Sequence, residues 1–75
     1  MGNRYIDRLV NGIGYEAKAG VDVGLTSSIR LQVLKDAELV ATGQLRGAEW
    51  YFFQGAQDDL LAFLKQSGIK YVVYP

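Results

Sequence analysis

The most specific local signal in this 75-residue chain lies in Arg4-Tyr-Ile-Asp-Arg-Leu-Val-Asn-Gly-Ile-Gly-Tyr-Glu-Ala-Lys-Ala19. Two segments with strand-forming residues, 4–10 and 13–19, flank the pair Asn11-Gly12. Asn-Gly is the favoured pair for a two-residue type I′ turn, because both turn positions need a positive φ. The sequence therefore predicts a β-hairpin over residues 4–19.

The turn also predicts which residues of the two strands face each other. With a two-residue turn Val10 pairs with Ile13, and counting along both strands sets Asp7 directly opposite Glu16. Directly opposed residues share one face of a sheet, as do residues i and i+2 of one strand. We therefore expect Asp7, Glu16 and Lys18 to project from the same side of the hairpin.

This arrangement of charges has a chemical consequence. Two carboxylates about 5 Å apart repel each other by roughly 3 kcal/mol at an effective dielectric constant of about 20. A divalent cation between Asp7 and Glu16 turns that repulsion into a binding site, and Mg²⁺ (or Mn²⁺) commonly binds carboxylates together with water and substrate phosphates. The ion would activate a bound water, which Lys18 could orient while stabilising charge in the transition state. The hairpin thus predicts a hydrolytic metal site.

The rest of the chain predicts two helices and two further strands. Thr26, Ser27 and Ser28 are helix N-cap residues, whereas Gly43 and Gly68 are typical residues after a helix end. The expected elements are a loop over 20–24, a helix from 26–28 to about 42, a strand over 49–53, a turn over 54–57, a helix over 59–67 capped by Asp58, and a strand over 69–74.

The order β-β-α-β-α-β predicts an α/β (α+β) fold in which residues 1–75 form a single domain. A hairpin followed by two strand–helix–strand crossovers implies a mixed four-stranded sheet with two helices packed on it. Because the core of so short a chain stabilises it only marginally, we also expect a homodimer or another completing partner.

Composition excludes several classes of function. The chain has no His and no Cys, which excludes His general bases, thiol nucleophiles, disulfides, and His- or thiolate-ligated metals. Eight basic and eight acidic residues balance, so no broadly basic nucleic-acid-binding surface is expected. No apolar run reaches membrane-spanning length, and we expect a soluble domain that acts in the cytoplasm without membrane partners.

An Asp on one strand and a Glu-x-Lys on the next, followed by a helix and another strand, resembles the PD-(D/E)xK (restriction-endonuclease-like) nuclease superfamily. The likeness covers nearly the whole chain and extends to the restriction-endonuclease-fold nuclease domains of bacterial polymorphic toxins. The matching runs are Asn3-Arg-Tyr-Ile-Asp7, Tyr15-Glu-Ala-Lys-Ala-Gly20, Ile29-Arg-Leu-Gln-Val-Leu-Lys-Asp-Ala-Glu-Leu39, Trp50-Tyr-Phe-Phe53 and residues 60–73.

The resemblance implies a minimal restriction-endonuclease-like core and an endonuclease that uses Mg²⁺ or Mn²⁺ on DNA, with RNA as the second choice of substrate. It implies that Asp7 and Glu16 bind metal and that Asp7, Glu16, Lys18 and Gln32 are catalytic. A toxin-type effector, possessing an immunity protein as partner, is the implied setting, and its parent could be secreted. Candidate phosphate contacts are Arg4, Arg8, Arg30 and Lys35.

Plainer interpretations stay open beside these. The family usually has a helix before the first catalytic strand and a longer loop after the aromatic strand, so we expect a truncated or minimal domain. Lys18 could form a simple surface ion pair, Gln32 could be a structural hydrogen-bonder, and the aromatic run at residues 50–53 could be core. The alternative function is a non-catalytic protein-interaction or oligomerisation module with a nuclease-like fold.

Overall fold

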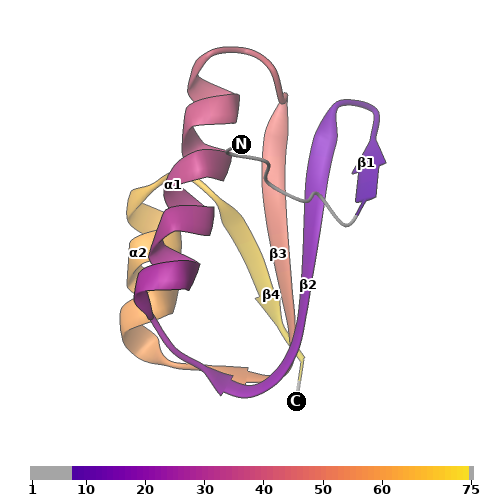
Figure 1. The fold of residues 1–75 in the computed structure, drawn as a ribbon. Helices are drawn as coiled ribbons and strands as arrows, with labels where there is room; N and C mark the ends of the chain where they lie inside the picture. Colours follow the sequence, from indigo (N-terminus) through magenta and orange to yellow (C-terminus); the bar gives the residue numbers. More distant parts are fainter. Residues whose placement is uncertain (1–7, 75) are drawn as a thin grey trace.

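The chain folds into two helices on one sheet. The computed structural model describes residues 8–74, with side chains described for residues 11–74. The elements follow the predicted order: β1 (Arg8–Val10), β2 (Ile13–Val23), α1 (Ser27–Ala41), β3 (Gly47–Ala56), α2 (Asp58–Gln66) and β4 (Lys70–Val73) (Figure 1).

β1 and β2 form a hairpin around Asn11-Gly12. The two turn residues have φ angles of 53° and 82°, as a type I′ turn requires. Val10 pairs with Ile13 in an antiparallel ladder, which is the register predicted for this turn. The hairpin prediction is confirmed for the strand pairs that the structure describes. Asp7, and with it the predicted opposition to Glu16, lies outside the described residues.

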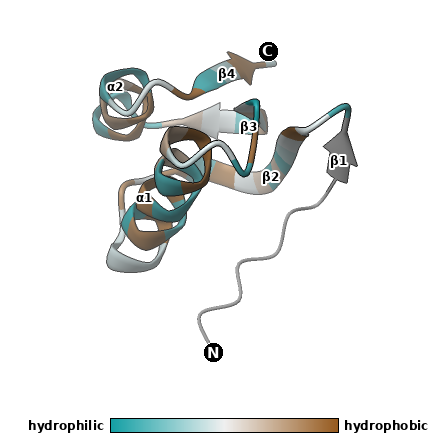
Figure 2. Ribbon diagram, turned by 90° about the horizontal axis from the view of Figure 1, so that it is seen from above, coloured by the Kyte–Doolittle hydropathy of each residue, from teal (hydrophilic) through white to brown (hydrophobic). Residues whose placement is uncertain are grey.

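Three strands of the sheet, β2, β3 and β4, run parallel, and the short β1 is antiparallel to the start of β2. The strand order in the sheet equals the chain order, so each crossover moves one strand further in the same direction. Because such crossovers are almost always right-handed, both helices must lie on the same side of the sheet. Figures 1 and 2 show α1 and α2 together on one side. We call this the helix-covered face and the opposite side the open face.

Alternation along β3 divides its aromatic residues between the two faces. Trp50 and Phe52 are fully buried beneath the helices, whereas Phe53 is 48 % exposed on the open face. Only part of the aromatic run is therefore core. The buried cluster under the helices consists of Val33, Ala48, Trp50, Phe52, Leu60, Leu64 and Ile69.

The first helix agrees with its predicted start and end. Thr26 is the N-cap, and its hydroxyl accepts a hydrogen bond from the Ile29 N–H at 3.2 Å. Thr42 is the C-cap residue, and Gly43 follows with a φ of 81°. Local capping chemistry was sufficient to predict this helix.

The two central strands are longer than predicted. β2 continues to Val23 through most of the segment 20–24 that was expected to be a loop, and β3 continues to Ala56 through most of the segment 54–57 that was expected to be a turn. The reason is long-range pairing: the register shifts between Lys18 and Val21, and β2 and β3 then pair again. Within the irregularity, Gln54 Nε2 donates a hydrogen bond of 2.7 Å to the Ala19 carbonyl oxygen. Tertiary pairing thus overrides the turn-forming composition.

The second helix and the last strand are displaced slightly from their predicted bounds. Gln57, not Asp58, is the N-cap of α2, and it makes no side-chain capping bond. Asp58 is instead the first helical residue, where a negative charge favourably meets the helix dipole.

Neither helix in the described part of the chain is long and apolar enough to cross a membrane.

Candidate active site

Two of the predicted site residues, Glu16 and Lys18, project from β2 onto the helix-covered face. They lie two residues apart on one strand, so their side chains share that face. Lys18 Nζ lies 3.1 Å from Glu16 Oε2, which is an ion pair. Glu16 is buried, with 7 % of its surface exposed. This pair is therefore not an ordinary solvated surface pair.

Gln32 on α1 adds a second partner for the same ammonium group. Lys18 Nζ donates a hydrogen bond of 2.7 Å to Gln32 Oε1. The ring of Trp50, on the neighbouring strand β3, lies 5.3 Å from Nζ, within the range of a cation–π contact. A carboxylate, an amide and an indole thus hold the Lys18 head group where β2 meets α1. The structure brings together three of the four residues predicted to be catalytic.

A buried carboxylate one helical turn beyond Gln32 was given no role from the sequence. Asp36 is 2 % exposed, and its Oδ2 accepts a hydrogen bond of 2.9 Å from Trp50 Nε1. Trp50 therefore connects Asp36 to the ammonium of Lys18. Both Glu16 and Asp36 also take part in further interactions.

The signal for Asp36 was present but ambiguous. Residues i and i+4 of a helix share a face, so the sequence predicts that the side chains of Gln32 and Asp36 project from the same face of α1. Whether that face of α1 lies against the sheet or is exposed to water depends on how α1 packs. Charged residues are seldom buried without partners, and in the sequence nothing near Asp36 identifies Trp50 as its partner.

The predicted phosphate contacts are divided. Arg30 lies on the side of α1 away from Gln32, with its guanidinium carbon 5.0 Å from the centre of the Phe63 ring on α2. Lys35 is half-buried and lies on the side of α1 that adjoins Gln32. Arg4 and the side chain of Arg8 lie outside the described part of the chain.

The donor atoms at this site are of the type that suits a hard divalent cation. Glu16 offers a carboxylate, and Mg²⁺ and Mn²⁺ prefer oxygen ligands; the Gln32 amide oxygen already accepts a hydrogen bond from Lys18. Among the described residues no three acidic, His or Cys side chains cluster as a metal site. The second predicted ligand, Asp7, lies outside them. The residues present fit an ion bound by few protein ligands, with water and substrate oxygens supplying the others.

Comparison of the chain with models of known protein families, with curated proteins and with solved structures finds no match.

Proposed function

We propose that this chain is a metal-dependent nuclease of the PD-(D/E)xK type, with a mixed sheet and two helices forming a minimal restriction-endonuclease-like core. It hydrolyses phosphodiester bonds with Mg²⁺ or Mn²⁺, in DNA first and RNA second. One observation carries the proposal: the ammonium of Lys18 is held between the carboxylate of Glu16 and the amide oxygen of Gln32, on the helix-covered face.

The free-energy cost of holding Glu16, Lys18 and Gln32 together supports a functional interpretation of these residues. A lysine side chain is long enough to extend its head group into water, and fixing it opposes roughly 2 kcal/mol of rotamer entropy. Burying Glu16 beside it adds a desolvation penalty that apolar side chains of similar volume would avoid. Arrangements that cost stability in this way concentrate at functional sites.

The chemistry assigns a role to each residue. An ammonium has three N–H donors, and contacts with Glu16 and Gln32 use two of them. The third can donate to a phosphate oxygen or to the attacking water, stabilising the negative charge that develops in the transition state. Gln32 fixes the direction of the remaining donor, because it anchors the head group to α1.

Glu16 would hold the cation together with Asp7, the residue that directly precedes the described strand β1 in the sequence. When bound, the ion acidifies a water molecule and polarises the phosphate. Phosphate groups would approach past Lys35 and the arginines Arg4 and Arg8. The resemblance further leads us to propose a toxin-type effector that acts on nucleic acid in the cytoplasm and has an immunity protein as partner.

The direct test is incubation of the purified chain with plasmid DNA and with total RNA, each with Mg²⁺ and with chelator. We expect metal-dependent cleavage that Lys18→Ala abolishes. Lys65→Ala is the matched control, because Lys65 is exposed on α2 away from the site. Cleavage retained by Lys18→Ala would remove the catalytic assignment, and chelator-resistant cleavage would remove the metal.

A second candidate, a non-catalytic protein-interaction module, is supported by the open face. Aromatic rings form a row across β2, β3 and β4: Tyr15–Tyr51, Tyr51–Tyr74 and Phe53–Tyr74 have centroid separations of 6.0, 6.3 and 5.2 Å. Tyrosine-rich surfaces are typical of binding sites. A metal titration separates the candidates: a nuclease predicts a rise in melting temperature with Mg²⁺ or Mn²⁺ that Glu16→Gln removes, whereas a pure interaction module predicts none.

A further inference from the structure

β4 differs from β2 and β3 because all four of its residues, on both faces of the sheet, are exposed. Tyr71, Val72 and Val73 are 36 %, 41 % and 39 % exposed, although all three are strand-forming apolar residues. β4 is also the last strand of the sheet, and among residues 8–74 no strand pairs with its outer edge. Proteins normally protect such edges, since unpaired backbone groups are a template for another strand.

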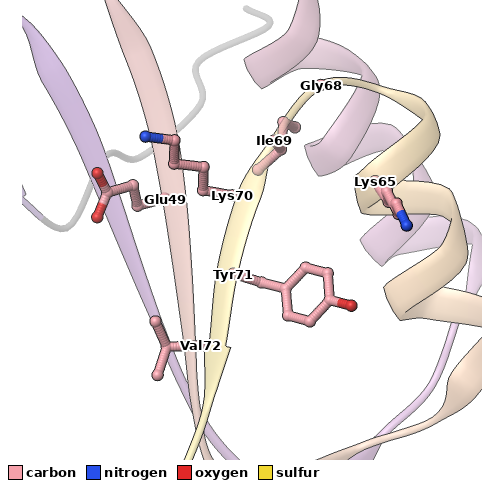
Figure 3. A pocket seen from close by; sticks show the side chains of 7 residues that line it. All are labelled: Glu49, Lys65, Gly68, Ile69, Lys70, Tyr71 and Val72. Atoms are coloured by element: carbon pink, nitrogen blue, oxygen red, sulfur yellow. The ribbon is translucent and has the colours of Figure 1, made fainter.

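A cavity lies alongside β4. This cavity of about 420 Å³ is lined by Glu49, Lys65 and residues 68–72 (Figure 3). In that view Tyr71 points toward α2, whereas Lys70 and Val72 point to the opposite side of the strand. A chain that lies along β4 would therefore contact side chains on both faces of the sheet.

The backbone of β4 shows which groups face outward. The Tyr74 N–H donates a hydrogen bond of 2.9 Å to the Phe52 carbonyl oxygen on β3. Successive residues of a strand direct their N–H and C=O groups to alternate sides. Tyr71 and Val73, which lie one and three residues before Tyr74, therefore direct their backbone groups away from β3 and toward the free edge.

We infer that the free edge of β4 binds β4 of a second copy of this chain, antiparallel and about a two-fold axis at Val72. In that register Tyr71 and the partner's Val73 exchange both of their outward backbone hydrogen bonds. Val72 meets the partner's Val72 at a non-hydrogen-bonded position, where side chains approach most closely. Each outward donor and acceptor of Tyr71 and Val73 is then satisfied.

The charge pattern favours a second copy over an unrelated peptide. Lys70 is the only charged residue of β4, and the two-fold axis sets it against the partner's Tyr74 rather than against the partner's Lys70. No like charges meet, and every apolar side chain of the strand faces an apolar or aromatic one. Such self-complementarity is the property that a two-fold interface requires.

The dimer should be weak. Four residues of a strand bury an area at or below the lower end of specific interfaces, which is about 1,200 Å² in total. We therefore expect a dissociation constant on the order of 10–100 µM, so the monomer predominates in dilute solution. This dimer does not depend on the nuclease proposal, because its contacts lie on β4, whereas Glu16, Lys18 and Gln32 lie where β2 meets α1.

Disulfide trapping gives a direct test, because the chain has no cysteine of its own. Val72→Cys should form a covalent dimer upon mild oxidation, since non-hydrogen-bonded antiparallel partners lie at disulfide distance. Leu31→Cys is the matched control: Leu31 is 67 % exposed but lies on α1. Efficient trapping of Val72→Cys alone supports the inference, and equal trapping of both variants overturns it.

Sedimentation of the unmodified chain over a concentration series supplies the second test. We expect a monomer–dimer equilibrium that Val72→Lys weakens roughly ten-fold or more, because two ammonium groups would then meet at the axis. Val73→Pro removes one outward N–H without touching the bonds to β3, and it should also give monomer with the far-UV spectrum retained. A chain that stays monomeric at millimolar concentration, or a dimer that neither substitution weakens, would overturn the inference.

Discussion

Lys18 on β2 and Gln32 on α1 are joined by a hydrogen bond of 2.7 Å between an ammonium nitrogen and an amide oxygen. This contact connects the sheet to the helix above it across 14 residues of sequence. It also fixes the head group of Lys18 at the end of a buried carboxylate, Glu16. The chemistry that we propose and the stability of the fold therefore share the same residues, and substitutions must separate the two.

Lys18→Met should destabilise the fold, because it leaves the buried carboxylate of Glu16 without its ammonium partner. We expect a loss of about 1–3 kcal/mol in the free energy of unfolding, measured by urea denaturation. Adding Glu16→Gln removes the buried charge and should recover much of that loss, while phosphodiester cleavage stays absent. Recovery of cleavage in the double variant would show that the pair has only a structural role.

Gln32→Leu removes the acceptor but keeps most of the side-chain volume. Because the lost hydrogen bond is to a charged group and is only part-buried, we expect a decrease of about 1–2 kcal/mol in unfolding free energy. Gln66→Leu, at an exposed position at the end of α2, should change stability by less than about 0.5 kcal/mol. Equal effects of the two substitutions would contradict the contact with Lys18.

Trp50→Phe should test the link between the core and Asp36. Phenylalanine retains a ring near Lys18 but removes the indole N–H that donates to Asp36 Oδ2. Losing this donor to a carboxylate that is 2 % exposed should cost about 1–3 kcal/mol, with a further contribution from the smaller ring. Calorimetry can measure the effect, and Gln66→Leu, at an exposed position at the end of α2, should cost clearly less. The indole N–H resonance in an NMR spectrum should also shift in Asp36→Leu.

Tyr51 on the open face should titrate at unusually high pH. Its hydroxyl donates a hydrogen bond to Glu49 Oε1, and this bond, with burial and the charge of Glu49, raises the pKa of Tyr51 from 10.0 to about 12. Between pH 10 and about 12 the Tyr51 hydroxyl therefore keeps its proton in the folded state, whereas it loses that proton in the unfolded state. The contribution of Tyr51 to stability is fully present below pH 10 and is lost as the pH rises to about 12.

Spectroscopic titration of the phenol groups provides the measurement. Glu49→Gln should bring the Tyr51 pKa back toward its usual value of 10.0. A Tyr51 titration that is unchanged by Glu49→Gln would contradict this assignment.

Gly12→Ala should damage the hairpin that orients β1 against β2. Gly12 has a φ of 82°, and a β-carbon there would lie 3.0 Å from Cγ and Cδ of Arg46. We expect a loss of at least about 1 kcal/mol, because an L-residue is strained in this conformation. Gly43→Ala has a similar φ but open space around it, so it serves as a control for the strain alone. A smaller loss for Gly12→Ala than for Gly43→Ala would show that the contact with Arg46 is unimportant.

Local signals were enough to predict much of this molecule. The Asn11-Gly12 pair predicts the turn and the register of the described hairpin, because few residues adopt two successive positive φ angles. Thr26 predicts the start of α1 by its side-chain hydrogen bond. The two-residue spacing of Glu16 and Lys18 predicts that they share a face, since side chains alternate along a strand. Each of these inferences depends on residues within one turn or one strand.

Features that depend on residues far apart in the sequence were decided only by the tertiary structure. The pairing of β2 with β3 beyond Lys18 extends both strands through segments whose composition favours turns. The packing angle of α1 decides that Gln32 meets Lys18 and that Asp36 lies against Trp50, and no local pattern contains that angle. Within residues 8–74, the strand order leaves no strand beside the outer edge of β4 and places both helices on one face of the sheet. Neighbouring residues restrict the backbone locally, whereas partners far apart in the chain are selected by the burial and hydrogen bonding of the whole domain.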